Sequence, residues 1–153
     1  MTPDALIYAL HTLAALIWVG GMFFAYVCLR PEAAGQLEPP PRLRLWRGVL
    51  ARFFTWVWVA VAAVLASGLA LLLRIGFAAA PLYQHIMFLM GLVMIAIYAY
   101  VFFAPYAGLS KAVAAEDWKA GGAALGRIRQ LVGTNLTLGF LTIAMGTLGR
   151  WLG

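Results

Sequence analysis

Two histidines are the residues of this chain with the clearest capacity for chemistry. His11 and His85 each lie near the start of an apolar stretch, the first and the third of the chain. An ionisable side chain inside a membrane helix is costly, so its presence indicates a function. Both stretches are expected to cross the membrane in the same direction, and at about 1.5 Å per residue the two imidazoles lie at nearly equal depth. This pairing predicts that His11 and His85 are the axial ligands of a b-type haem iron.

Two other interpretations of the histidines stay open. They hold a different metal, or they are structural, with His11 bonded to a carbonyl of a neighbouring helix and His85 at the membrane surface. The chain has one cysteine, Cys28, so no internal disulfide, no CxxC metal pair and no CxxCH haem attachment can form. A bound haem would therefore have no covalent bond to the protein.

Three further residues are candidates for contact with a haem. Trp18 lies two turns from His11 on the same helical face, where its ring could stack on a planar cofactor. Arg74 and Arg150 are the two arginines expected at the end of the bundle that is nearer to the histidines. We therefore expect them to pair with the haem propionates.

Methionines favour copper as the alternative cofactor, because thioethers suit Cu(I). Met22 lies on the face of His11, about 16 Å along the helix axis, and is a metal ligand only in this copper alternative. Met87, Met90 and Met94 form a second group in the third stretch, where they lie nearly opposite the histidine of that stretch. They cannot share a pocket with that histidine and are expected to pack or to face lipid.

The elements that must carry these side chains follow from composition. The chain has 153 residues, of which 65% are hydrophobic and 10% charged, whereas soluble domains carry about 25% charged residues. Four apolar stretches, 5–29, 49–73, 82–104 and 128–149, are each long enough to cross a bilayer as a helix. We predict a single all-α domain, an integral membrane four-helix up-and-down bundle. Pro31 and Pro105 are expected to follow the ends of the first and third helices.

The connections between the stretches carry most of the charge. Pro39, Pro40 and Pro41 predict a stiff extended connector, followed by an interfacial segment that leads into the second helix. Nine cations lie on one predicted side and two on the other, so the positive-inside rule places both termini on the outer, periplasmic side. The nine are Arg30, Arg42, Arg44, Arg47, Arg52, Lys111, Lys119, Arg127 and Arg129.

Several classes of function are excluded by the sequence. The net charge of +6 lies beside apolar stretches, which indicates a bilayer with anionic headgroups as the partner and not nucleic acid. No Asp, Glu or Lys lies inside a predicted span, which argues against a proton-coupled transporter. No hydrolase triad, nucleotide loop or acidic metal cluster is present. Small residues such as Gly21, Gly139 and Gly146 are expected to pack helices against one another.

The first stretch carries a family resemblance. The run from His11 through Trp18, Gly20 and Gly21 to Phe24, with Leu29-Arg30-Pro31 after it, resembles the first helix of the copper-resistance CopD domain. It is also similar to the small membrane proteins of the HemJ type, which oxidise protoporphyrinogen. The CopD resemblance implies copper handling at the bacterial inner membrane. The HemJ resemblance implies a haem protein in which the functional first-helix histidine is His11.

Two departures from the HemJ pattern favour a two-histidine site. Where those proteins have a Tyr-Leu-Pro-Arg-like run, this chain has Phe24-Ala25-Tyr26-Val27. They also use a lysine in the third helix, where this chain has none and opens instead with His85.

The leading expectation is a multi-pass inner-membrane protein that binds haem b and transfers electrons to a quinone or a small redox partner, with a homodimer left open. Copper binding or transport is the alternative. HemJ-like protoporphyrinogen oxidation and a non-catalytic membrane subunit follow as second alternatives. If the protein is an enzyme, it is a membrane oxidoreductase.

Overall fold

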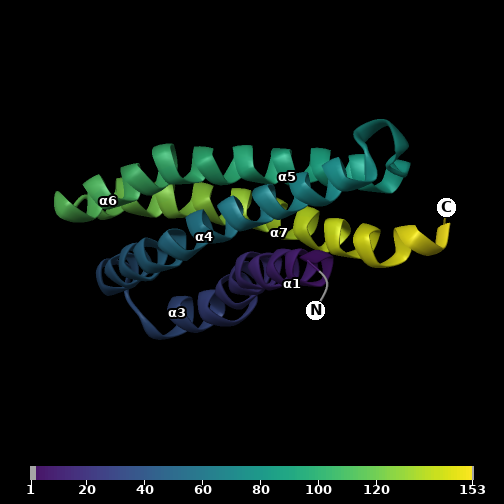
Figure 1. Ribbon diagram of the computed structural model, residues 1–153. Coiled ribbons are helices and arrows are strands. Elements are labelled where there is room, and N and C mark those ends of the chain that lie inside the picture. Colours follow the sequence, from purple (N-terminus) through teal and green to yellow (C-terminus); the bar gives the residue numbers. More distant parts are fainter. Residues whose placement is uncertain (1–2, 153) are drawn as a thin grey trace.

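Four long helical spans joined by short connections make up the described chain, which is residues 3–152 of the computed structural model (Figure 1). The first span comprises α1 (Pro3–Ala15), the π-helical turn η1 (Leu16–Gly20), α2 (Gly21–Phe23), the π-helical turn η2 (Phe24–Leu29) and α3 (Arg30–Gln36). The second is α4 (Pro39–Ile75). The third comprises α5 (Leu82–Val101), the π-helical turn η4 (Phe102–Tyr106) and α6 (Ala107–Ala114), and the fourth is α7 (Trp118–Leu152).

The spans have the length and composition of membrane-crossing helices. Each contains an 18-residue window with high hydropathy, and large apolar side chains such as Trp56, Leu89 and Phe103 are exposed on the outside of the bundle. Exposed apolar side chains of this size are what lipid requires of a bundle surface. The predicted all-α, four-helix membrane fold is therefore confirmed. The periplasmic placement of the termini stays a prediction.

The four spans pack as a flattened bundle. The first span packs on α4 through α1, the third packs on α7 through α5, and α4 and α7 also contact each other across the centre. The first and third spans therefore lie on opposite sides of the α4–α7 pair, as Figure 1 shows. The start of α1, the end of α7 and the short α4–α5 connection lie at one end, which we call the terminal end. The α3–α4 and α6–α7 connections lie at the other, the basic end, where the nine predicted cations gather.

Prolines do not end the first and third helices, contrary to the sequence prediction. Pro31 lies inside the first span at the start of α3, and Pro105 lies inside the third span within η4. A proline in an α-helix removes an N–H and its ring clashes with the carbonyl four residues back. A π-helical turn adjoins or contains each of these prolines. The wider turn accommodates the ring, so both helices continue to the basic end.

The proline run before the second span is helical and not an extended connector. Pro39 and Pro40 form the first turn of α4, after Glu38 with φ −61° and ψ 159°. The first turn has no intrahelical partner for its N–H groups, so proline is tolerated there. The expected interfacial segment is consequently the first turns of α4 itself.

The remaining connections are short and have local causes. Gly76 ends α4 with φ 90°, a conformation that favours glycine, and the 3-10 turn η3 (Phe77–Ala79) leads to α5. At the basic end, the carboxylate of Asp117 accepts a 2.9 Å hydrogen bond from the N–H of Ala120 and so caps α7. Tight connections of this kind hold consecutive spans antiparallel.

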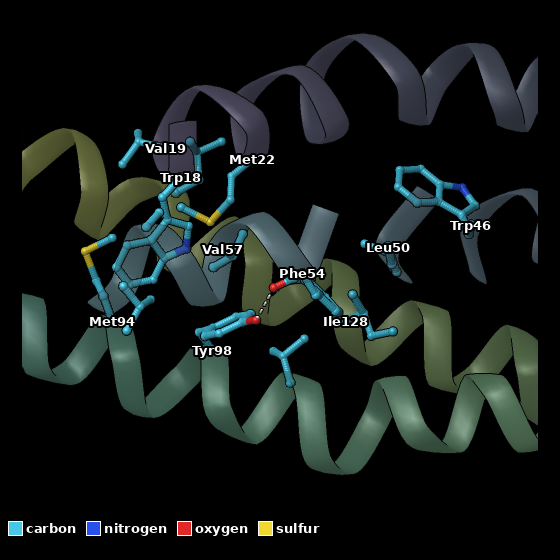
Figure 2. Close-up of a cluster of buried hydrophobic side chains, with 14 of the residues drawn as sticks. Trp18, Val19, Met22, Trp46, Leu50, Phe54, Val57, Met94, Tyr98 and Ile128 are labelled. Carbon is cyan, nitrogen blue, oxygen red and sulfur yellow. Dashed lines mark hydrogen bonds between the residues drawn. The ribbon is translucent and has the colours of Figure 1, made fainter. Parts of the chain in front are cut away.

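An aromatic cluster fills the middle of the bundle (Figure 2). The hydroxyl of Tyr98 on α5 donates a 2.9 Å hydrogen bond to the carbonyl of Phe54 on α4. Trp18 of η1 lies edge-on to the same tyrosine, with ring centroids 6.1 Å apart. Edge-to-face packing at this separation is favourable. The first and third spans therefore meet through side chains at the level of Trp18 and Tyr98.

Glycines receive large side chains from neighbouring spans. A Cβ at Gly21 would overlap the ring of Phe53, a Cβ at Gly139 would lie 2.9 Å from Val19, and a Cβ at Gly146 would lie 2.8 Å from Met87. The packing role predicted for the three glycines is confirmed.

Candidate functional site

His11 is anchored to the second span near the terminal end. Its Nδ1 lies 2.9 Å from the hydroxyl oxygen of Ser67 on α4, which is 4% exposed. Gly68 makes room for the ring, since a Cβ at that position would lie 3.3 Å from His11 Cε1. The Ser67-Gly68 pair thus positions the imidazole through one polar contact and one missing side chain.

The hydrogen-bond network around Ser67 favours one tautomer of His11. Ser67 has one hydroxyl proton, which it donates to the carbonyl of Ala63, with the carbonyl of Val64 3.2 Å away. In this arrangement its oxygen accepts from His11, and Nδ1 carries the ring proton. Nε2 keeps its lone pair and makes no hydrogen bond within the described chain. A neutral imidazole held by its other nitrogen is the form that ligates metals.

His85 is directed to the loop at its own end of the bundle. Its Nε2 lies 3.0 Å from the carbonyl oxygen of Phe77, and its Nδ1 lies 3.3 Å from that of Pro81. The Phe77 ring also lies edge-on, with centroids 4.8 Å apart. Both nitrogens of His85 therefore face acceptors of the α4–α5 connection. The structure shows no contact between His85 and His11 among the described residues.

The other predicted haem contacts lie apart from one another. Trp18 is 3% exposed and packs in the aromatic cluster. Arg74, at the end of α4, forms an ion pair with Asp4 of α1. Arg150 belongs to α7, but its side chain lies outside the described residues.

Three methionines line one face of α7. Met87 lies against Gly146, Met94 lies against Gly139 and Thr142, and Met22 of α2 lies against Asn135. The contacted α7 residues are 146, 142, 139 and 135, at spacings of four, three and four, so they lie along one side of that helix. At 1.5 Å per residue, this thioether row spans about 16 Å along the bundle. Met94 is thus buried against α7, and the partly buried Met87 packs on the same helix.

Each of the two deeper thioethers contacts a polar group. The Asn135 side-chain N–H donates to the sulfur of Met22 at 3.8 Å, and the hydroxyl of Thr142 lies 3.9 Å from the sulfur of Met94. Met22, Met94 and Asn135 are each 3% exposed. Figure 2 shows the two methionines on either side of Trp18. Buried thioethers with oriented polar neighbours are suited to a soft cation such as Cu(I).

Asn135 also carries an unpaired acceptor. Its Oδ1 is buried and has no hydrogen-bond partner in the described chain. A cavity of about 10 Å³ lies beside it, walled by Trp18, Met22 and Tyr98 among others. A buried carbonyl without a partner costs about 1–3 kcal/mol, and a cavity of this size has room for about one water molecule.

The sequence identified the candidate metal ligands but not the polar side chains that contact them. Ser67, Asn135 and Thr142 are polar or small residues of their spans, which the sequence alone assigns to packing. The spacing of Asn135, Gly139, Thr142 and Gly146 is the sequence signal that could have identified one face of the fourth span.

No group of three or more His, Cys, Asp or Glu side chains able to hold a metal ion occurs among the described residues. A resident metal centre of that kind is not evident in this part of the chain.

Comparison with known proteins gives one result. A family model described as CopD, copper resistance protein D, matches residues 47–148, more than half of the chain. No curated protein and no solved structure matches the chain. The matched range covers most of α4 together with α5, α6 and nearly all of α7. It does not include the first span, on which the sequence resemblance was based.

Proposed function

The chain belongs to the CopD family, and from this premise we propose that it binds Cu(I) inside the bundle and passes it along the thioether row. The observation that supports the proposal is the row itself, three methionine sulfurs on one face of α7 that extend about 16 Å through the bundle. That length is about half of a bilayer's hydrocarbon thickness. We place this activity in the inner, plasma membrane of a bacterium.

Each member of the row has a distinct part in the proposal. Met87 lies nearest to the terminal end, Met94 lies in the middle, and Met22 lies deepest, beside Asn135. A thioether is neutral, so it takes Cu(I) without having to lose a proton and releases it again at low cost. The Asn135 amide orients the sulfur of Met22 through its N–H. Copper stays Cu(I) throughout, so no electron donor or acceptor is required.

His11 supplies a second kind of ligand near the terminal end. Its Nε2 lone pair is available because Ser67 holds Nδ1–H. Imidazole binds copper well. We assign His11 to the capture of copper at the terminal end, before the ion enters the row.

The experiment is a Cu(I) titration of the purified protein in lipid nanodiscs against a coloured Cu(I) chelator. Met22→Leu and Met94→Leu should each weaken binding at least tenfold, because removing even a residue that only positions a metal ligand costs about 10–100-fold in affinity. Met145→Leu is the matched control, since this methionine lies on α7 itself and outside the row. Equal affinity in the Met22, Met94 and Met145 variants would contradict the proposal. Uptake of Cu(I) into proteoliposomes separates transport from binding.

Haem b is the second candidate, and the observation that favours it is the same free Nε2 of His11. His85 fits poorly as the second axial ligand, because both of its ring nitrogens face backbone carbonyls. The visible spectrum of the purified protein tests this candidate. A Soret band that changes in His11→Ala would support a haem with a redox role. A preparation that contains neither haem nor copper would leave a non-catalytic membrane subunit.

A further inference from the structure

A second cavity lies at the basic end, far from the histidines. It has a volume of about 300 Å³ and lies between the first, second and fourth spans. This is within the size range of ligand pockets, at its lower limit. The thioether row and its small cavity do not account for it, and nothing above depends on it.

The charge around this cavity is of one sign. Arg30 of α3, Arg42 of α4 and Arg129 of α7 line it, and none of its lining residues is an Asp or a Glu. The arginines that form ion pairs in the described chain are others, Arg44 with Glu116 and the arginine at the end of α4 with Asp4. Three arginines from three spans therefore line the cavity with no carboxylate among the lining residues, and the guanidinium of Arg30 lies 4.5 Å over the ring of Tyr26, which also lines it. Guanidinium groups bind phosphate with two parallel hydrogen bonds.

The rest of the cavity is apolar and aromatic. Leu50, Phe53 and Phe54 of α4 form part of its wall, and Trp46 and Trp118 also line it. Tryptophan is enriched where a membrane meets water. Phe53 and Phe54 also wall the small cavity beside Asn135, so the apolar part extends towards the bundle centre. The site therefore combines a basic mouth at the membrane surface with an apolar interior.

We propose that this cavity binds an anionic phospholipid, with the headgroup phosphate on Arg30, Arg42 and Arg129 and one acyl chain in the apolar part. A ligand must be anionic to satisfy the arginines and must carry a hydrocarbon chain to fill the wall of leucine and phenylalanine. Basic pockets between membrane helices hold anionic headgroups by this chemistry. A lipid seated here would join three spans at the basic end. The inference stands independently of copper binding.

Two glycines allow the hydrocarbon part to be tested separately from the charge. Gly122 and Gly126 lie one turn apart on α7 and line the cavity, and a Cβ at either would meet nothing within 4 Å. Gly126→Phe should therefore fill the cavity without a backbone clash, and Gly122→Leu should fill it less completely. Both leave the three arginines unchanged.

The experiment uses the full chain in detergent and adds phosphatidylglycerol, phosphatidylcholine or inorganic phosphate. Native mass spectrometry counts bound lipid, and thermal unfolding reports the shift in Tm. Phosphatidylglycerol should bind and raise Tm. The headgroup of phosphatidylcholine has no net charge, so its affinity should be lower than that of phosphatidylglycerol by about fivefold for each arginine that pairs with the net negative headgroup. Arg42→Gln combined with Arg129→Gln should lower phosphatidylglycerol affinity by about 25-fold by the same measure.

Arg127→Gln is the matched control for Arg129, since it removes the same charge two residues away on α7 and does not line the cavity. It should leave lipid binding unchanged. Equal binding of phosphatidylglycerol and phosphatidylcholine would overturn the proposal. An equal Tm shift with inorganic phosphate alone would assign the arginines to free phosphate and overturn the lipid assignment. Unchanged lipid binding in both glycine variants would remove the acyl chain from the cavity.

Discussion

The contact between His11 and Ser67 gives the sharpest prediction, because its loss has an energetic and a chemical consequence that can both be measured. Ser67→Ala removes the side-chain acceptor of the His11 ring. Polar contacts between membrane helices average about 0.6 kcal/mol and reach about 1.7. A 2.9 Å bond to a hydroxyl that is 4% exposed belongs in the upper half of that range, so we expect about 1 kcal/mol.

The single variant will show less than this coupling. Alanine is a better helix former than serine by about 0.5 kcal/mol, so Ser67→Ala should lower the free energy of unfolding by only about 0.5 kcal/mol. A double-mutant cycle with His11→Leu removes this term and should return the full coupling of about 1 kcal/mol. The measurement is unfolding by dodecyl sulfate in mixed micelles. Ser110→Ala, the other serine of the chain, is the control and should show no coupling to His11.

The same variant should change where the ring proton lies. In the wild type, nitrogen NMR should show a protonated Nδ1 and an unprotonated Nε2 on His11. In Ser67→Ala the acceptor for Nδ1–H is absent, and the Nε2–H form should gain population. Cu(I) affinity at the terminal end should then fall by about 10–100-fold, as happens when the group that orients a metal-binding histidine is removed. A wild-type spectrum with the proton on Nε2, or a coupling below about 0.3 kcal/mol, would refute the reasoning.

Three further predictions concern packing and the α4–α5 connection. Gly21→Val should lower the free energy of unfolding by about 1–3 kcal/mol through overpacking. Gly48→Ala is its control and should raise that free energy by about 0.5–1 kcal/mol, because a Cβ there meets nothing within 4 Å. Both are measured by unfolding in mixed micelles, and equal effects of the two variants would contradict the packing at Gly21. Tyr98→Phe should lower the free energy of unfolding by about 1 kcal/mol, since it removes one buried hydrogen bond, and a rise in stability would count against that bond. His85→Ala should speed hydrogen exchange around Phe77 while leaving Cu(I) affinity unchanged, and a loss of affinity would return His85 to the metal site.

The sequence was sufficient for the number and type of the spans, because an apolar stretch in lipid has no structure open to it except a helix. It failed at Pro31 and Pro105, where the usual rule ends a helix. The π-helical turns at Phe24–Leu29 and Phe102–Tyr106 accommodate these prolines. No local pattern in those residues reports them.

The candidate site was only partly predictable. Counting residues along each helix predicts similar depths for His11 and His85, and this stays a prediction. The direction in which each ring turns does not follow from counting, since it depends on Ser67 for one and on the carbonyl of Phe77 for the other. The sequence could not assign Met87 and Met94 to α7 or to lipid without the packing of Gly139 and Gly146.

The π-helical turn η2 has a consequence for how this chain tolerates changes in length. A π-helical turn holds one more residue than the α-helical turn that it replaces. Deleting one residue from Phe24–Leu29 would therefore restore an α-helical turn and leave the helix beyond it facing the same way, because the wider turn already absorbs the extra residue. Arg30 would keep its place at the cavity of the basic end. The same deletion in a uniform α-helix such as α4 would rotate everything beyond it by about 100°. The first span should therefore tolerate a one-residue deletion in this segment that α4 would not.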